Sequence, residues 1–229
     1  MSDTGQASRL MRAQSWPLPA VYDHLLQHYG PQHWWPAQSS FEMMLGAMLV
    51  QNTTWVAAHG AVQALHRAGL HSPEALRSAP EAQIQSLIRP AGFFRQKYKR
   101  IRALALFMIH YQDCTKLLFE IEGESLRETL LTIYGIGPET ADSICCYEAK
   151  QPWFIVDSYT QRLFQRLGWI ENRWPYNTLQ QAVHGQLPAD AAVLGEFHAL
   201  IVRHSKDHCS AKPQCHHCPL THYCAFATL

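Results

Sequence analysis

The feature that most constrains the fold is a glycine-containing turn in the run Leu131–Asp142, which reads Leu-Thr-Ile-Tyr-Gly-Ile-Gly-Pro-Glu-Thr-Ala-Asp. Gly135 and Gly137 permit positive φ on either side of Ile136, and Pro138 suits the first position of a helix, where a missing N–H costs nothing. The backbone N–H groups of such a turn converge on an anion, and the helix N-terminus behind them adds partial positive charge. The run therefore predicts two helices joined by a phosphate-binding turn, with a plain helix–helix connection as the alternative.

A group of four cysteines near the C-terminus is the second strong signal. They follow the pattern Cys-x5-Cys-x2-Cys-x5-Cys, and four thiolates within sixteen residues can hold a zinc ion or an iron–sulfur cluster. Only one pair has the two-residue spacing of a zinc knuckle, which favours the cluster. Disulfides are the alternative, but the N-terminus lacks the basic and apolar segments of a secretion signal, so we expect a cytoplasmic protein with reduced thiols. The predicted ligands are Cys209, Cys215, Cys218 and Cys224.

The composition is that of a globular protein. The chain has 229 residues, 47% of them apolar and 16% charged, which suits one or two domains. No apolar run is long enough to span a membrane. A net charge of +1 is low for a protein that binds nucleic acid. Between Glu81 and Asp113, however, acids are absent, and six basic residues form either a phosphate-facing surface or a solvated helix face: Arg89, Arg95, Lys97, Lys99, Arg100 and Arg102.

Apolar residues recur at helical spacing through much of the chain, whereas strand signals are short and isolated. The segment Phe41–Leu49 places four apolar residues on one helical face. Two further helices are expected to begin where Pro73 follows the capping residue Ser72, and near Glu81, which follows Pro80. These patterns predict an all-α protein.

In these features the chain resembles the helix-hairpin-helix DNA glycosylases, the superfamily of endonuclease III, from about Phe41 to the C-terminus. Two further segments support the match: Phe41–Thr53 resembles the family's first barrel helix, and Leu87–Lys97 resembles its glycine turn and basic helix. The resemblance implies two helical lobes with a cleft between them. A six-helix barrel with the hairpin would occupy residues 41–150. Residues 17–40 and 151–229 would form the second lobe, with the cysteine loop at 209–224, and residues 1–16 would be a flexible N-terminus.

The resemblance also implies a monomer that binds double-stranded DNA containing a damaged base. Gln51 would fill the gap that an extracted base leaves in the stack, with Asn52 beside it, and an exposed polar helix end is the alternative. Gly135, Gly137 and Lys97 would contact the DNA. The cysteines would hold a [4Fe–4S] cluster, as in endonuclease III. Backbone carbonyls of the hairpin would bind a monovalent cation against the DNA phosphate, namely those of Leu131, Ile133 and Ile136.

Two carboxylates carry the expected chemistry. Cleavage of an N-glycosidic bond builds positive charge on the deoxyribose, so a fixed carboxylate lowers the barrier and can orient or deprotonate water. Asp157 is the candidate, and a role as N-cap of the helix beginning near Ser158 is compatible with catalysis. Bifunctional relatives have a lysine at the position of Glu139, whose amine forms a Schiff base that leads to strand cleavage. A carboxylate cannot do this, so we expect a monofunctional enzyme unless Lys97 or Lys150 substitutes. Glu139 then either positions water or is structural.

The base that is removed is suggested by three short segments. His33–Pro36, Val50–Trp55 and Ala141–Ile144 are similar to the 3-methyladenine DNA glycosylase III branch, which removes alkylated purines. A cationic alkylpurine gains from stacking on indole faces, so Trp34, Trp35 and Trp55 are expected either in the base pocket or as core side chains between the lobes. Two other functions stay open: an endonuclease III-like glycosylase and lyase for oxidised or mismatched pyrimidines, and a lesion-binding protein without catalysis.

Overall fold

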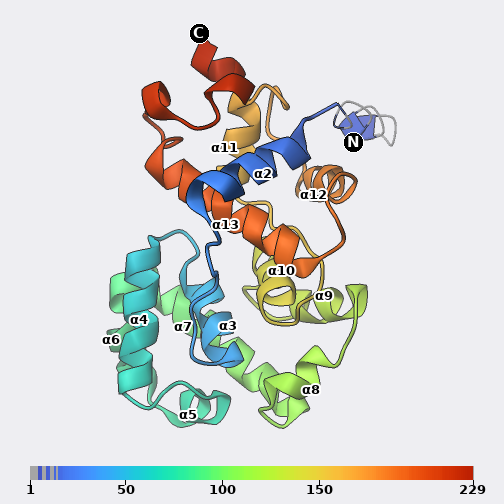
Figure 1. Ribbon diagram of the computed structural model, residues 1–229. Helices are drawn as coiled ribbons and strands as arrows, with labels where there is room; N and C mark the ends of the chain where they lie inside the picture. The colour runs from blue at the N-terminus through green and yellow to red at the C-terminus, as the bar shows by residue number, and fades with distance from the viewer. Residues whose placement is uncertain (1–4, 7–8, 11–12, 14, 229) are drawn as a thin grey trace. The chain divides into compact units, whose positions relative to one another are not determined.

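The computed structural model describes residues 5–6, 9–10, 13 and 15–228, and within these residues all regular elements are helices, which confirms the predicted all-α fold (Figure 1). The chain divides into two compact units. Unit 1 contains Met1–Trp34 and Pro152–Leu229, and unit 2 contains Trp35–Gln151. Residues 35–40, which the resemblance assigned to the lobe formed by the chain ends, therefore belong to unit 2.

Unit 2 is built around one buried helix. Helix α3 (Ser40–Leu49) is buried from Phe41 to Leu49, because its sequence is apolar on nearly all sides. Ser39 caps it by accepting a hydrogen bond from the Glu42 N–H at 3.2 Å. Helices α4, α7 and α10 pack against α3 (Figure 1). The remaining elements are α4 (Trp55–Arg67), α5 (Pro73–Ser78), α6 (Glu81–Ile88), η1 (Arg89–Ala91), α7 (Phe94–Phe107), η2 (Met108–Tyr111), α8 (Thr115–Phe119), α9 (Glu124–Leu131) and α10 (Pro138–Tyr147).

Both helix starts expected from proline-containing pairs are present. The Ser72 hydroxyl accepts a hydrogen bond from the Ala75 N–H at 3.2 Å, and Pro73 is the first residue of α5. Helix α6 begins at Glu81, directly after Pro80. A side-chain cap therefore marks the start of α5, and a proline directly before the first residue marks the start of α6.

Unit 1 has a hydrophobic core of its own, formed by α2 (Leu18–Tyr29), α11 (Ser158–Arg166), α12 (Tyr176–His184) and α13 (Ala191–Asp207). Trp16 lies in this core, stacked on Trp169 with ring centroids 5.2 Å apart. Ala13 and Trp16 are only 1% and 6% exposed, although residues 1–16 were expected to be flexible. Residues 1–4, 7–8, 11–12 and 14 of that segment lie outside the described residues. Three short helices complete the unit: η3 (Cys215–His217), η4 (Thr221–Tyr223) and η5 (Ala225–Thr228).

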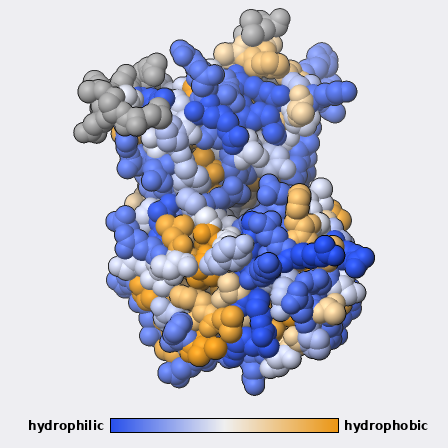
Figure 2. Space-filling view, turned by 180° about the vertical axis from the view of Figure 1, so that it is seen from behind, coloured by the Kyte–Doolittle hydropathy of each residue, from blue (hydrophilic) through white to orange (hydrophobic). Residues whose placement is uncertain are grey.

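The surface of unit 2 carries several exposed apolar side chains. The space-filling view shows them as orange areas among hydrophilic ones (Figure 2). Val56 is 80% exposed at the start of α4, and Phe93 is 67% exposed directly before α7. Within the described part of the chain, none of the helices combines the length and the hydropathy needed to cross a bilayer.

Candidate functional site

In the turn between α9 and α10, one of the two glycines, Gly135, has the predicted positive φ. The Ile136 N–H donates to the Ile133 carbonyl at 3.0 Å, which closes a four-residue turn. Gly135 has φ +91°, a conformation that glycine tolerates best. Gly137, which was expected to share it, has φ −103° and is the N-cap of α10. A Cβ at Gly137 would meet nothing within 4 Å, so the start of α10 is open to a close-approaching ligand.

The Gln51 side chain is hydrogen-bonded to this turn. Its Nε2 donates to the Gly135 carbonyl at 3.0 Å and to Thr140 Oγ1 at 2.9 Å, and its Oε1 accepts a hydrogen bond from the Arg100 guanidinium. The Arg100 side chain lies against Gly135, where an added Cβ would be 2.7 Å from Cδ and 2.9 Å from Cβ of the arginine. Without DNA, the Gln51 amide is therefore hydrogen-bonded to the hairpin, and its filling of a gap in the base stack stays a prediction. Asn52, the next residue, is exposed and has φ +54°.

Lys97 also has a different position from the expected one. Its side chain is 1% exposed, and Nζ donates to the carbonyls of Leu49 and Ala91, both at 2.7 Å. Burial, together with the charge of Arg100, lowers the pKa of Lys97 to about 8. The lysine joins the end of α3 to the turn before α7, and its role as a DNA contact stays a prediction.

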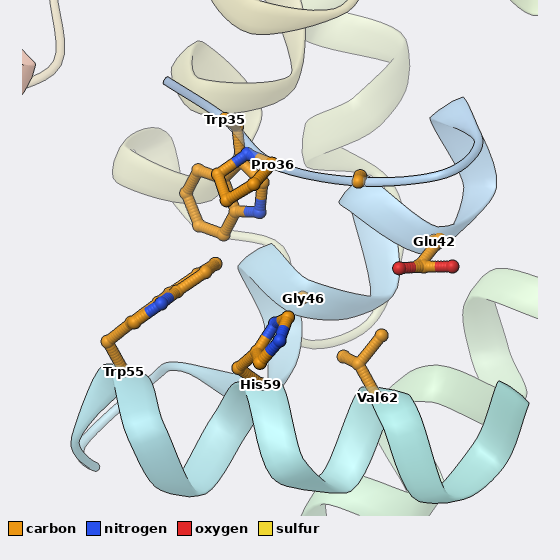
Figure 3. Close-up of a pocket in the computed structure, with 8 residues that line it drawn as sticks. Trp35, Pro36, Glu42, Gly46, Trp55, His59 and Val62 are labelled. Carbon is orange, nitrogen blue, oxygen red and sulfur yellow. The ribbon is translucent and has the colours of Figure 1, made fainter. Parts of the chain in front are cut away.

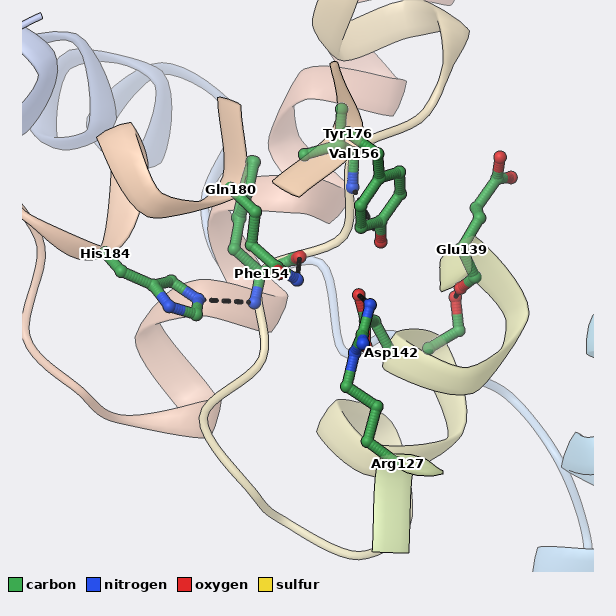
Figure 4. A network of polar contacts seen from close by, with 9 residues as sticks. Arg127, Glu139, Asp142, Phe154, Val156, Tyr176, Gln180 and His184 are labelled. Carbon is green, nitrogen blue, oxygen red and sulfur yellow. Dashed lines mark hydrogen bonds and ion pairs between the residues drawn. The ribbon is translucent and has the colours of Figure 1, made fainter. Parts of the chain in front are cut away.

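The two helices of the hairpin are joined by a buried ion pair. Arg127 on α9 donates through Nε to Oδ1 of Asp142 on α10 at 2.6 Å, and Asp142 is 0% exposed (Figure 4). Glu139 lies on the first turn of α10, where it is exposed, and its carboxylate points away from Asp142 (Figure 4). The hairpin helix thus presents a carboxylate at the position where bifunctional enzymes of the resembled family have an amine.

Asp157 caps α11 and is held from two directions. Oδ1 accepts hydrogen bonds from the Thr160 N–H at 2.7 Å and from the Thr160 hydroxyl at 3.0 Å. Oδ2 lies 3.5 Å from Nε2 of His198 on α13. Burial is the largest single influence on the pKa of Asp157 and raises it, but His198 and Thr160 together outweigh burial, so the pKa is lowered. Asp157 is therefore a buried carboxylate that is kept charged, and its capping role is present as well.

The extended segment that leads to Asp157 is anchored by side chains of α12. His184 Nε2 accepts a hydrogen bond from the Phe154 N–H at 3.0 Å, and Gln180 Nε2 donates to the Phe154 carbonyl at 2.7 Å (Figure 4). The Val156 N–H donates to the Tyr176 hydroxyl at 3.4 Å. These side chains take the place of a neighbouring strand and fix the backbone on which Asp157 is carried.

Unit 2 contains a pocket with an aromatic end and an acidic end (Figure 3). Trp35 and Trp55 meet edge to face, with centroids 5.0 Å apart. The Trp35 indole lies against Gly46 of α3, where a Cβ would be 3.4 Å from its Nε1. Glu42, from the first turn of α3, lines the other end. Trp34 belongs to unit 1 and does not line this pocket, so of the three predicted tryptophans the structure brings together two.

The four C-terminal cysteines lie in the C-terminal loop of unit 1, and each of them is a free thiol. Arg166 donates to Cys209 Sγ at 3.1 Å, and Cys218 Sγ lies 3.7 Å from Nε2 of His204. Four thiols with a cationic donor beside one of them are chemically suited to an iron–sulfur cluster or a zinc ion. Nevertheless, among the residues with described positions, no three His, Cys, Asp or Glu side chains are grouped as a metal site. In this structure the four thiols share one loop but do not surround a common point.

Four residues of the site were not found from the sequence. His198 and Arg100 lie far along the chain from the residues they contact, whereas Glu42 and His59 lie within a few residues of the tryptophans whose pocket they line. The basic run that includes Arg100 was noticed, but only as a surface. A buried polar side chain follows the same helical spacing as an exposed one, so only the packing of the helices distinguishes them.

Comparison with known proteins agrees with this geometry. Residues 45–188 match the family described as HhH-GPD superfamily base excision DNA repair protein. A protein of Methanocaldococcus jannaschii, provisionally named a DNA repair glycosylase, is 37% identical over 206 residues, which cover 89% of this chain and 94% of that protein. Endonuclease III of Thermotoga maritima is 28% identical over 191 residues, or 81% of this chain and 83% of the relative.

Solved structures show the same fold. An endonuclease III–DNA complex superimposes with a TM-score of 0.76 at 22% identity, covering 92% of this chain and 95% of the other. Helicobacter pylori 3-methyladenine DNA glycosylase (MagIII) bound to 1,N6-ethenoadenine gives a TM-score of 0.68 at 27% identity, covering 86% and 97% of the two chains. The superfamily expected from the sequence is confirmed: the chain belongs to the HhH-GPD superfamily of base excision DNA repair proteins.

Proposed function

We propose that this protein is a monofunctional DNA glycosylase that removes alkylated purines from double-stranded DNA by hydrolysis and leaves an abasic site. One observation carries the proposal: the chain holds a buried, charged carboxylate, Asp157, while its hairpin helix presents Glu139 in place of an amine. Hydrolysis needs a fixed carboxylate such as Asp157, whereas strand cleavage through a Schiff base needs an amine, which Glu139 does not supply.

Asp157 supplies the electrostatic part of the reaction. As the N-glycosidic bond breaks, positive charge develops on the sugar, and a carboxylate that is already charged and fixed stabilises it without reorganising. The Thr160 N–H and hydroxyl and the nearby His198 ring keep Asp157 ionised at neutral pH. The same carboxylate can orient or deprotonate the attacking water.

The two lysines that could have replaced the missing amine are engaged elsewhere. Lys97 is buried, and its Nζ is hydrogen-bonded to two backbone carbonyls. Lys150 donates to the Tyr147 carbonyl at 2.6 Å. The lowered pKa of Lys97 would make its amine a better nucleophile, but an amine that is 1% exposed cannot reach a sugar without unfolding the end of α3. This favours water as the nucleophile.

DNA binding is proposed for the hairpin and the end of α3. The open space at Gly137 allows a phosphate to approach the N–H groups at the start of α10. Gln51, with the exposed Asn52 directly after it, is the proposed residue that fills the gap in the base stack. The carbonyls of Leu131, Ile133 and Ile136 remain the proposed ligands of a monovalent cation.

Two features support an alkylated purine as the base. Trp35 and Trp55 place two indole rings side by side in unit 2, and indole faces attract an electron-poor ring. The H. pylori relative is named for 3-methyladenine and was solved with an ethenoadenine base. Relatives named endonuclease III favour the alternative, a glycosylase for oxidised or mismatched pyrimidines.

We also propose that Cys209, Cys215, Cys218 and Cys224 hold a [4Fe–4S] cluster. Such a cluster would tie the C-terminal loop together through thiolate–iron bonds and would supply a redox centre. Anaerobically purified protein should absorb near 400 nm and contain about four iron atoms per chain, and Cys218→Ser should lose both. One zinc ion per chain in place of iron would refute the assignment.

The enzymatic test uses DNA duplexes with single defined lesions, in which base release and strand nicking are scored separately. The wild type should release N7-methylguanine or N3-methyladenine, and nicks should appear only after alkali. Asp157→Asn should abolish release while DNA affinity is retained, and Glu171→Gln, a change at an exposed acid of the same unit, should behave as the wild type. Release of an oxidised pyrimidine, or nicking without alkali, would refute the proposal in favour of the endonuclease III alternative.

A further inference from the structure

The Gln51 side-chain amide has both of its hydrogens engaged within the protein. One goes to the Gly135 carbonyl at 3.0 Å and the other to Thr140 Oγ1 at 2.9 Å, while the amide oxygen accepts from the Arg100 guanidinium. All four residues belong to unit 2, in which α3 packs against both α7 and α10. An amide with no hydrogen left to donate cannot donate to a DNA base unless it first leaves the hairpin.

The Arg100 guanidinium, in contrast, has a donor to spare. Its Nε is buried and has no hydrogen-bond acceptor among the described residues. The side chain lies so close to the hairpin that a Cβ at Gly135 would be 2.7 Å from Arg100 Cδ. If Gln51 leaves, the Gly135 carbonyl loses its donor and Arg100 loses its acceptor, and these two groups are neighbours. The arginine can then donate to the carbonyl, so the hairpin has a second arrangement in which neither group is left unpaired.

We propose that Thr140 and Arg100 hold Gln51 in a retracted position and release it when DNA offers its amide new partners; this rests on the proposed function, in which Gln51 fills a gap in the base stack. In an intact duplex, the pairing edges of the bases are occupied by one another. Where a base has been extracted, the base left opposite presents free donors and acceptors. Release therefore has a cost that a gap repays and intact DNA does not. Thr140 and Arg100 are positioning residues that set this cost.

A permanent role of Gln51 as a brace of the hairpin predicts a different result. Thr140 is 6% exposed on the first turn of α10, so Thr140→Val removes the hydroxyl and keeps the shape of a buried side chain. If Gln51 is a brace, losing this bond loosens the hairpin and weakens DNA binding. If Gln51 is retracted, losing the bond makes its release easier and strengthens binding to DNA that contains a gap.

The test measures Kd by fluorescence anisotropy for a duplex with one tetrahydrofuran abasic-site analogue, in a cycle of wild type, Thr140→Val, Gln51→Ala and the double variant. Gln51→Ala alone should weaken binding. Thr140→Val should lower Kd about fivefold more in the presence of Gln51 than in the Gln51→Ala background, because one neutral hydrogen bond no longer opposes release. The intact duplex of the same sequence should show no such coupling.

The control is Thr129→Val on α9, which should behave as the wild type with both duplexes, and circular dichroism establishes that each variant is folded. Equal effects of Thr140→Val in the two backgrounds, weaker binding in the presence of Gln51, or the same coupling on intact DNA would each overturn the inference. So would an unchanged Kd in Gln51→Ala.

A direct measurement follows the side-chain amide of Gln51 by NMR, with its signal identified by its loss in Gln51→Ala. In the free protein and with intact duplex the amide hydrogens should exchange slowly with water, and the signal should shift on addition of the abasic-site duplex. A signal that stays unshifted would overturn the inference. Neither experiment requires base release, so a protein that releases no alkylated purine but shows the coupling would refute the proposed reaction and leave the release of Gln51 standing.

Discussion

Replacing Gly135 by alanine tests the hairpin geometry most directly. The glycine has φ +91°, and its Cα faces the root of the Arg100 side chain. A new Cβ would lie 2.7 Å from Cδ and 2.9 Å from Cβ of the arginine. Because these atoms are close to the backbone of α7, a rotation at the end of the side chain cannot relieve the contact. Arg100 would have to move as a whole and release Gln51.

The cost follows from two independent effects. Placing an L-residue in the left-handed region costs about 1–2 kcal/mol. Losing the charged hydrogen bond between Arg100 and Gln51 costs about 1.5–3 kcal/mol, because both groups are partly buried. We therefore expect Gly135→Ala to lower the free energy of unfolding by about 2.5–5 kcal/mol. Gly137→Ala, at φ −103° and facing open space, should cost less than about 1 kcal/mol and should instead weaken DNA binding.

Urea unfolding followed by circular dichroism at 222 nm measures both costs. The double variant Arg100→Ala/Gly135→Ala completes the comparison, since without the arginine side chain the added methyl group should cost only the backbone part, about 1–2 kcal/mol. Equal destabilisation by Gly135→Ala and Gly137→Ala, or an undiminished cost of the methyl group in the Arg100→Ala background, would refute the steric reasoning.

Three further outcomes are expected. The pKa of Lys97 is lowered to about 8 in the folded state, so between about pH 8 and 10.5 the unfolded chain binds more protons than the folded one. The free energy of unfolding should therefore rise with pH in this range. Urea titrations should show that Lys97→Met removes the rise and that the control Lys99→Met keeps it. The pKa of Asp157 is lowered from its ordinary value of 3.8, so the ionised carboxylate stabilises the fold fully above pH 3.8 and loses this effect as pH falls through the lowered pKa. The difference in unfolding free energy between the wild type and Asp157→Asn should therefore disappear on acidification and stay constant from pH 5 to 7. Gln180→Ala leaves the Phe154 carbonyl without its donor, and should cost about 1–3 kcal/mol and reduce base release, whereas the exposed neighbour variant Gln181→Ala should do neither.

The sequence predicted those parts of the fold that local chemistry controls. Helix α5 begins after Ser72 and Pro73 as expected, since capping and proline geometry act within a few residues. Gly135 was assigned correctly to positive φ, but Gly137 was not, because the same residue type also serves as an uncrowded N-cap. A glycine in a sequence indicates that space or rotation is needed, and it does not say which.

The contacts that the long polar side chains make within the protein were not predicted from the sequence. Gln51 and Lys97 belong to segments that resemble DNA-contacting parts of relatives, and both turn inward to bind backbone carbonyls. Nothing in their spacing could show this, because the carbonyls they bind come from other parts of the chain. The Asp157–His198 contact was invisible for the same reason. Asp157 itself was found because its cap position is local and the family motif includes it.

The anchoring of Asp157 and the pocket near Glu42 depend on two separate hydrophobic cores, one in each unit. If the proposed base pocket is the one near α3 and α4, a substitution there would alter which base is accepted while Asp157 keeps its partners on α11 and α13. Evolution can explore new lesions in one half of such a chain under little constraint from the reaction step, which stays under selection in the other half. Relatives with the same fold and different substrates are the expected result, and directed evolution of lesion specificity should begin with libraries confined to unit 2.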